Sequence, residues 1–296
     1  MKKFSFIFLN LFIFLFILAL LGLCRSQSLV RNYGKDLSWH RKVFDNGSYQ
    51  TLFLGDSRVY HAINPELFTN AYNFAFSANS YSSFYLGLAK ERLKKKGQRK
   101  IYLGITPESL SLYEGNKEID KYLKHKLPVI SLWNVIKRNI FTSLDLISFL
   151  KTGTFRELNS PFLEGNTTIY NDNGWWEVSA EVKESEAMAR NYEQRLLKFP
   201  PDSGLINQLL KTVTDWKKEG IDVYGFYLPT SPMVAKAEKK ALEKVFSFTQ
   251  FREAFKHSGG QWLDIDLEVE NPTFDGDHLN KNFAYFFTKK LYQLSL

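Results

Sequence analysis

From Tyr49 onward, short apolar segments that look like buried strands alternate with longer segments that have helical spacing. The strand-like segments are 49–54, 71–76, 100–105, 221–228 and 261–265. The helical segments are 82–96, 205–218, 234–256 and 280–293. Such alternation is typical of a mostly parallel sheet covered by helices. The sequence therefore predicts an α/β domain over residues 45–296.

One long stretch breaks this alternation. Residues 108–201 contain two expected helices, 130–151 and 182–197, and a loop-like segment, 155–177. We interpret this stretch as a helical insertion between the third and fourth strands of the sheet.

The N-terminal segment has the character of a membrane anchor. The run from Phe4 to Cys24 is almost wholly apolar, and a span of about 20 such residues crosses a bilayer. No small-residue cleavage site follows it, and Leu23 is a poor neighbour for a lipoprotein cysteine. We predict an uncleaved transmembrane helix within residues 1–27, with the rest of the protein periplasmic or extracellular. A secreted form and a lipoprotein form are the alternatives.

Composition excludes several classes of protein. The single Cys rules out an intramolecular disulfide and argues against a Cys-based zinc site. The formal charge of +8 falls to +5 once Lys2, Lys3 and Arg25 around the apolar run are set aside. The remaining basic residues carry no nucleic-acid-binding motif. We therefore expect no nucleic-acid partner, no metal and no cofactor.

The first strand runs directly into Gly55-Asp56-Ser57, at the edge of the sheet where α/β proteins bind ligands. A turn there would leave the Ser57 hydroxyl exposed at the start of a helix. Serine becomes a useful nucleophile only when a base lies within reach and an acid orients that base. The alternative is that Ser57 only caps the helix.

A matching base lies near the end of the chain. His278 follows the last expected strand, and Asp275 lies three residues before it. Asp277 competes for the same role, but the spacing favours Asp275. Ser57, His278 and Asp275 together predict a catalytic triad.

These two motifs, Gly55-Asp56-Ser57 and Asp275 to His278, resemble two blocks of the SGNH/GDSL hydrolase superfamily. The segments 54–58, 73–78 and 103–107 are similar to its bacterial membrane-anchored envelope members, which include alginate-acetylation proteins and the D-alanyl transfer protein of teichoic acids. The resemblance covers about residues 49–107 and 221–295. It implies a flavodoxin-like, three-layer α/β/α fold, with Ser57 as nucleophile, His278 as base and Asp275 as the partner of His278.

The resemblance also implies an oxyanion hole, in which this sequence departs from the family. Ser57 and Ala78 would give backbone N–H groups, with Ala78 standing where the family usually has Gly. The third block lacks its usual Asn, so Thr106 and Asn79 are the candidate side-chain donors. Loss of one donor can cost ~10²–10³ in rate, which reduces the simple esterase activity that we expect.

Three further side chains are candidate substrate contacts. Arg58 could contact an anionic or sugar substrate, or be solvated. Trp175 and Trp176 could stack on a sugar ring, or form a small core of the insertion.

The sequence thus predicts an extracytoplasmic serine esterase or O-acyltransferase that acts through an acyl-enzyme. Acyl esters of a cell-envelope polysaccharide or lipid are the expected substrates. An acyltransferase of this kind can also require a separate membrane protein that delivers the acyl group. The alternative is a non-catalytic envelope assembly or glycan-binding protein that keeps the fold.

Overall fold

The computed structural model describes residues 12–13, 42, 45–77, 79–112, 167–179, 185–267 and 272–296. The chain divides into two compact units. One comprises Met1–Val43 with Lys126–Phe162, and the other comprises Phe44–His125 with Leu163–Leu296. Most of the predicted anchor (1–27) and the whole of the predicted helix 130–151 lie outside the described residues. No described helix combines the length and apolar character that a membrane crossing requires.

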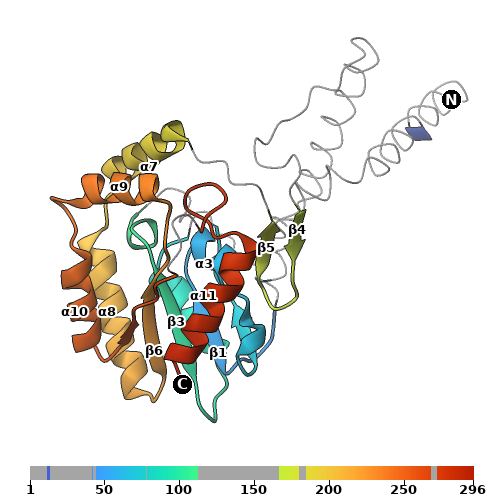
Figure 1. The fold of residues 1–296 in the computed structure, drawn as a ribbon. Coiled ribbons are helices and arrows are strands. Elements are labelled where there is room, and N and C mark those ends of the chain that lie inside the picture. Colours follow the sequence, from blue (N-terminus) through green and yellow to red (C-terminus); the bar gives the residue numbers. More distant parts are fainter. Residues whose placement is uncertain are drawn as a thin grey trace, which may run out of the picture. The chain divides into compact units, whose positions relative to one another are not determined.

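The second unit is built on a five-stranded sheet in which every pair of neighbours is parallel. From edge to edge the strands are β2 (Ala71–Asn73), β1 (Thr51–Leu54), β3 (Lys100–Ile105), β6 (Asp222–Tyr227) and β7 (Gln261–Leu263). This doubly wound order changes direction between β1 and β3, which is where such sheets bind ligands. The predicted, mostly parallel α/β sheet is confirmed (Figure 1).

Helices cover both faces of the sheet. Side chains alternate along each strand, and those on both faces are buried, so each face needs a layer of helices. On one face, Phe226 of β6 contacts Phe287 of α11 (Lys281–Leu294), and α11 packs beside α3 (Ser57–Ala62). On the other face, Gly225 leaves room for Phe255 of α10 (Phe248–His257). α8 (Ser203–Lys218) lies on that face with α10 and α4 (Ser83–Glu91) (Figure 1). The arrangement fits a three-layer α/β fold.

Two glycines let α3 approach the ends of the strands. A Cβ atom at Gly55 or at Gly104 would lie well inside van der Waals contact of Val59, on α3. The Tyr81 hydroxyl lies 3.1 Å from the Leu54 carbonyl and 2.8 Å from the Gly104 carbonyl, so it joins the ends of β1 and β3. The first residue of α3 is thereby held tightly against the edge of the sheet.

Two predicted helices differ from those observed. The predicted helix 234–256 is two helices, α9 (Pro232–Leu242) and α10, because Ser247 caps a new helix through the Gln250 N–H. No Gly or Pro marks this break in the sequence. The predicted helix 82–96 ends at Glu91, because the next residues pair with Tyr49: the Lys94 N–H donates to the Tyr49 carbonyl over 2.8 Å.

The predicted loop 155–177 is wrong in its described part. Residues 167–179 form an antiparallel hairpin, β4 (Thr167–Tyr170) with β5 (Trp176–Ser179). Gly174, with φ of +84°, allows its tight turn. α7 (Glu186–Lys198) follows and packs on α9. Short 3₁₀ turns at Pro65–Leu67 and Glu108–Leu110 complete the described elements.

Candidate active site

Ser57 is the first residue of α3, directly after the turn that leaves β1. Asp56 is the N-cap of this helix and accepts a hydrogen bond from the Arg58 N–H over 3.0 Å. Burial raises the pKa of Asp56, while Arg58, Thr106 and His278 oppose the rise. Asp56 is therefore a capping residue, and Ser57 itself is left half-buried at the edge of the sheet.

A second turn, from the other end of the chain, meets Ser57. The Ser57 Oγ lies 2.8 Å from the Nε2 of His278. The Phe274 N–H donates to the His278 carbonyl, which closes the turn on itself, and the Ser231 N–H donates to the Gly276 carbonyl. The loop after β6 therefore supports the turn that carries His278.

The other nitrogen of His278 faces two carboxylates. Nδ1 lies 2.8 Å from Asp275 Oδ2 and 2.9 Å from Asp277 Oδ1. Burial by itself would lower the pKa of His278, but the two carboxylates outweigh it and hold this pKa well above its ordinary value. Burial would raise the pKa of Asp277, but the facing His278 ring leaves it below its ordinary value.

The candidate oxyanion donors have different positions. Ala78 lies outside the described residues. The Thr106 hydroxyl donates to Asp56 and accepts from the Ser109 N–H. The Asn79 amide is directed at the Gly55 carbonyl, 3.4 Å away. Both side chains are thus engaged with the protein itself.

Arg58 points into the protein rather than toward solvent. Its side chain is 1% exposed and its Nη2 lies 2.6 Å from Glu238 Oε1. Nη2 also donates to the Tyr192 hydroxyl, and Tyr192 and Tyr227 both donate to Glu238. Because this cluster surrounds Arg58, the solvated alternative is excluded, and the side chain offers no exposed face to a substrate.

The two tryptophans are placed differently. Trp175 is 5% exposed, lies in the main core and donates from Nε1 to the His61 carbonyl over 2.8 Å. Trp176 is half-buried, with its ring centre 4.4 Å from that of His61. The His61 ring in turn stands 4.8 Å from the His278 ring, nearly perpendicular to it. Trp176 is therefore the one of the pair that lies near the triad.

Sequence reasoning did not single out three residues beside the triad. Phe274 stacks on the His278 ring at 5.8 Å, and Glu108 and Arg195 form an ion pair near Asp277. Burial raises the pKa of Glu108 to about 7, while Arg195 opposes the rise. Glu108 follows the end of β3, and its place at a strand exit could have marked it as a candidate site residue. Arg195 lies on α7, and no local pattern connects it to the strand exits.

Within the described part of the chain, one group of side chains has the donor set of a metal site. It consists of Asp275, Asp277 and His278, whose ligand atoms lie within 4.8 Å of one another. Both nitrogens of His278 are already engaged, Nδ1 with the carboxylates and Nε2 with Ser57. The arrangement fits a hydrogen-bonded triad better than metal ligation.

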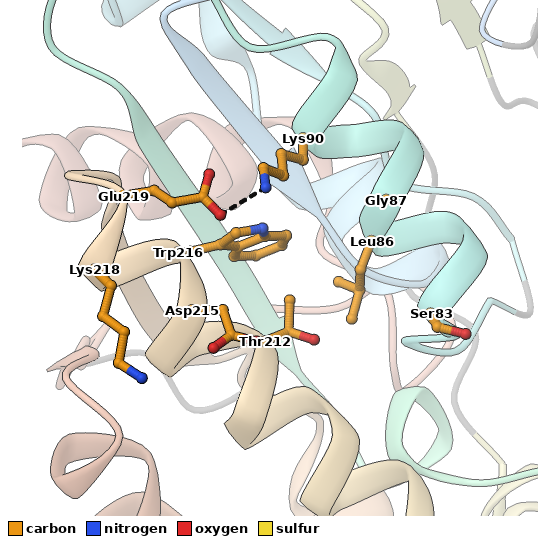
Figure 2. A pocket seen from close by; sticks show the side chains of 9 residues that line it. All are labelled: Ser83, Leu86, Gly87, Lys90, Thr212, Asp215, Trp216, Lys218 and Glu219. Atoms are coloured by element: carbon orange, nitrogen blue, oxygen red, sulfur yellow. Dashed lines mark hydrogen bonds and ion pairs between the residues drawn. The ribbon is translucent and has the colours of Figure 1, made fainter.

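A groove of ≈ 430 Å³ between α4 and α8 contains none of these residues. Figure 2 shows Lys90 and Glu219 paired at the groove, beside the Trp216 ring. Its walls also include Leu86, Gly87 and Thr212. This groove is therefore separate from the candidate active site.

Comparison with known proteins gives little further information. No family model matches the chain, and no curated protein matches it. Among solved structures, it is similar to one described as "a putative platelet activating factor from Streptococcus pneumonia". The identity is 13% and the TM-score 0.38, over 91% of this chain and 98% of that chain. A likeness at this level carries no argument about the site. The assignment of the site therefore depends on its geometry alone.

Proposed function

We propose that this protein is a serine hydrolase or O-acyltransferase of the SGNH type. The observation that carries the proposal is the line of hydrogen bonds from Ser57 Oγ through the His278 ring to Asp275, with 2.8 Å at each end of the ring. A serine, a base and an orienting acid in this geometry are what nucleophilic acyl transfer requires. The two-block resemblance of the sequence supports the same assignment.

The proposed reaction has two steps. Ser57 Oγ attacks the carbonyl carbon of an ester while His278 Nε2 takes the hydroxyl proton. The tetrahedral intermediate then expels the alcohol, which leaves with that proton, and the acyl group stays on Ser57. In the second step His278 deprotonates an attacking water or sugar hydroxyl. The acyl group then departs as a free acid or as a new ester, and His278 returns the proton to Ser57 Oγ. Asp275 holds the His278 ring and stabilises its charged form throughout.

The substrate class and the location are part of the proposal. The apolar run from Phe4 to Cys24 supports a membrane tether, and hence a catalytic domain outside the cytoplasm. The resemblance to envelope proteins supports an acyl ester of an envelope polysaccharide or lipid as substrate. A membrane protein that supplies the acyl group would then be a natural partner.

One observation favours a second candidate function, a non-catalytic assembly or glycan-binding protein. The Thr106 hydroxyl donates to Asp56, and the Asn79 amide donates to the Gly55 carbonyl. An oxyanion hole that lacks a side-chain donor loses ~10²–10³ in rate. Reactivity of Ser57 separates the two functions.

The test is covalent labelling of the full chain with a fluorophosphonate. We expect wild type to be labelled and Ser57→Ala to lose the label completely, because the reagent reacts only with an activated serine. Ser83→Ala, at an exposed serine on α4, is the matched control and should label like wild type. A folded wild-type protein that takes no label would contradict the proposal and favour the binding function.

If labelling succeeds, a p-nitrophenyl acyl ester separates hydrolase from transferase. Release of nitrophenol that speeds up when an acceptor sugar is added, with acyl sugar as product, identifies a transferase. Release that does not respond to the sugar, with free acid as product, identifies a hydrolase.

A further inference from the structure

The imidazole of His278 has two acid partners on one nitrogen. Asp275 Oδ2 and Asp277 Oδ1 lie 2.8 Å and 2.9 Å from Nδ1. The side chains of both acids are largely buried, at 9% and 16% exposure. A triad needs only one acceptor on this nitrogen, so the role of the second carboxylate requires an explanation.

The backbone of the turn brings both carboxylates to the ring. Gly276, between them, has φ of +103°, a conformation that favours glycine. The second oxygen of Asp275 accepts hydrogen bonds from the N–H groups of Asp277 and His278, over 3.3 Å and 3.0 Å. Asp275 is therefore fixed on two sides, and Asp277 reaches the same ring nitrogen from the other side of the glycine.

Carboxylates outnumber arginines around this pair. From α3, Arg58 and His61 face the turn, and from α7, Arg195 does so. Further carboxylates come from other elements: Asp56 before α3 and Glu108 after β3, with Glu238 of α9 taken up by Arg58. Two carboxylates that share one Nδ1 favour an imidazole that carries its second proton. The pKa of His278 is accordingly well above its ordinary value.

We propose that Asp277 is a positioning residue of the active site, a second acid partner that shares the Nδ1–H of His278 with Asp275. The proposal rests on the proposed function, since it assigns a role within the same triad. Below the raised pKa, His278 holds a proton on Nε2 and cannot accept the one from Ser57. The rate should therefore rise with pH through a midpoint above the ordinary histidine range of about 6.5.

Redundancy is a second consequence. In a triad with one acid, replacing the acid by its amide costs ~10⁴ in turnover, because the ring loses its tautomer. Here Asp277 still accepts the Nδ1–H in Asp275→Asn, so we expect a loss of only ~10–10² and expect the full ~10⁴ in the double variant. Asp277→Asn removes one negative charge, and should raise the rate at pH 6, as a fraction of the maximal rate, by about tenfold.

The experiment combines two readouts on the full chain. The histidine rings are labelled with ¹⁵N and titrated by NMR in wild type, Asp277→Asn and Asp275→Asn, with the His278 signal assigned from its loss in His278→Gln. The pH profile of kcat/KM on a p-nitrophenyl ester is measured for the same variants and for the double variant. We expect His278 of wild type to titrate above 6.5 and each single variant to titrate lower.

Two results would overturn the proposal. One is a His278 titration and kinetic midpoint that stay unchanged in Asp277→Asn. The other is a loss in Asp275→Asn as large as that in the double variant. If Asp277→Asn does not fold, a wild-type His278 that titrates at or below 6.5 overturns it as well. If His278 titrates above 6.5 but the protein shows neither labelling nor ester hydrolysis, the proposed function is contradicted. The sharing of the His278 Nδ1–H by Asp275 and Asp277 is then still supported.

Discussion

Two ion pairs of this protein have the same length and very different surroundings. Beside the triad, Arg58 and Glu238 lie 2.6 Å apart with 1% and 6% of their side chains exposed. At the groove between α4 and α8, Lys90 and Glu219 also lie 2.6 Å apart, with 44% and 41% exposed (Figure 2). Distance alone would rank the two pairs as equal.

Burial makes the difference. Charges removed from water are costly unless they are paired and hydrogen-bonded, whereas an exposed pair exchanges freely with solvent. The two oxygens of Glu238 accordingly accept hydrogen bonds from Arg58, Tyr192 and Tyr227. Loss of one partner should therefore destabilise the fold more beside Ser57 than at the groove between α4 and α8.

The largest effect is expected from Glu238→Gln. It leaves the buried guanidinium of Arg58 without its counter-charge, which should lower the free energy of unfolding by about 3–5 kcal/mol. Glu219→Gln is the matched control and should cost only about 0.2–1 kcal/mol. Chemical denaturation of both variants and of wild type measures the two values. Equal losses in the two variants would show that burial does not distinguish the pairs.

Gly104→Ala should have an intermediate effect. The added methyl group collides with Val59 on α3, and overpacking of this kind costs about 1–3 kcal/mol. Because α3 begins with Ser57, fluorophosphonate labelling should also become slower. Denaturation and labelling rates measure the two effects, and a variant with wild-type stability and labelling would contradict the close packing of α3 on β3.

Gly87→Ala should have the smallest effect, with the opposite sign. Gly87 lies inside α4 at the groove, and a Cβ there meets no atom within 4 Å. Replacing a helical glycine should raise the free energy of unfolding by about 0.5–1 kcal/mol. Labelling of Ser57 should stay at the wild-type rate. Slower labelling would connect the groove to the triad and contradict its assignment as a separate region.

Strands were easier to predict than helix ends. The strand predicted over 100–105 coincides with β3, and the other four predicted strands contain the observed ones, because buried parallel strands are short, continuous apolar runs. The break between α9 and α10 was missed because the apolar spacing continues across it, although Ser247 and Gln250 have the spacing of a capping box. The β4–β5 hairpin escaped prediction because its strands, Thr-Thr-Ile-Tyr and Trp-Glu-Val-Ser, mix polar with apolar residues and form no continuous apolar run.

The candidate site divides in a similar way. Ser57, Asp275 and His278 could be proposed from spacing, because one strand exit and one turn before the last helix each have a recognisable local pattern. The burial of Arg58 could not, since its partners lie on β6, α7 and α9, far away in the sequence. The partners of Thr106 and Asn79 are likewise decided by side-chain packing, which no spacing encodes.

The sequence by itself determined the parallel α/β sheet and the residue types available at its strand exits, because both depend on local periodicity and on turn chemistry. Only the tertiary structure decided which groups meet. It brings His278 into contact with Ser57, although the two lie far apart in the sequence. It also places two carboxylates against one nitrogen of the His278 ring and buries Arg58 nearby. These contacts join residues up to 221 positions apart, and contacts at such separation follow from packing of the whole sheet rather than from any local pattern.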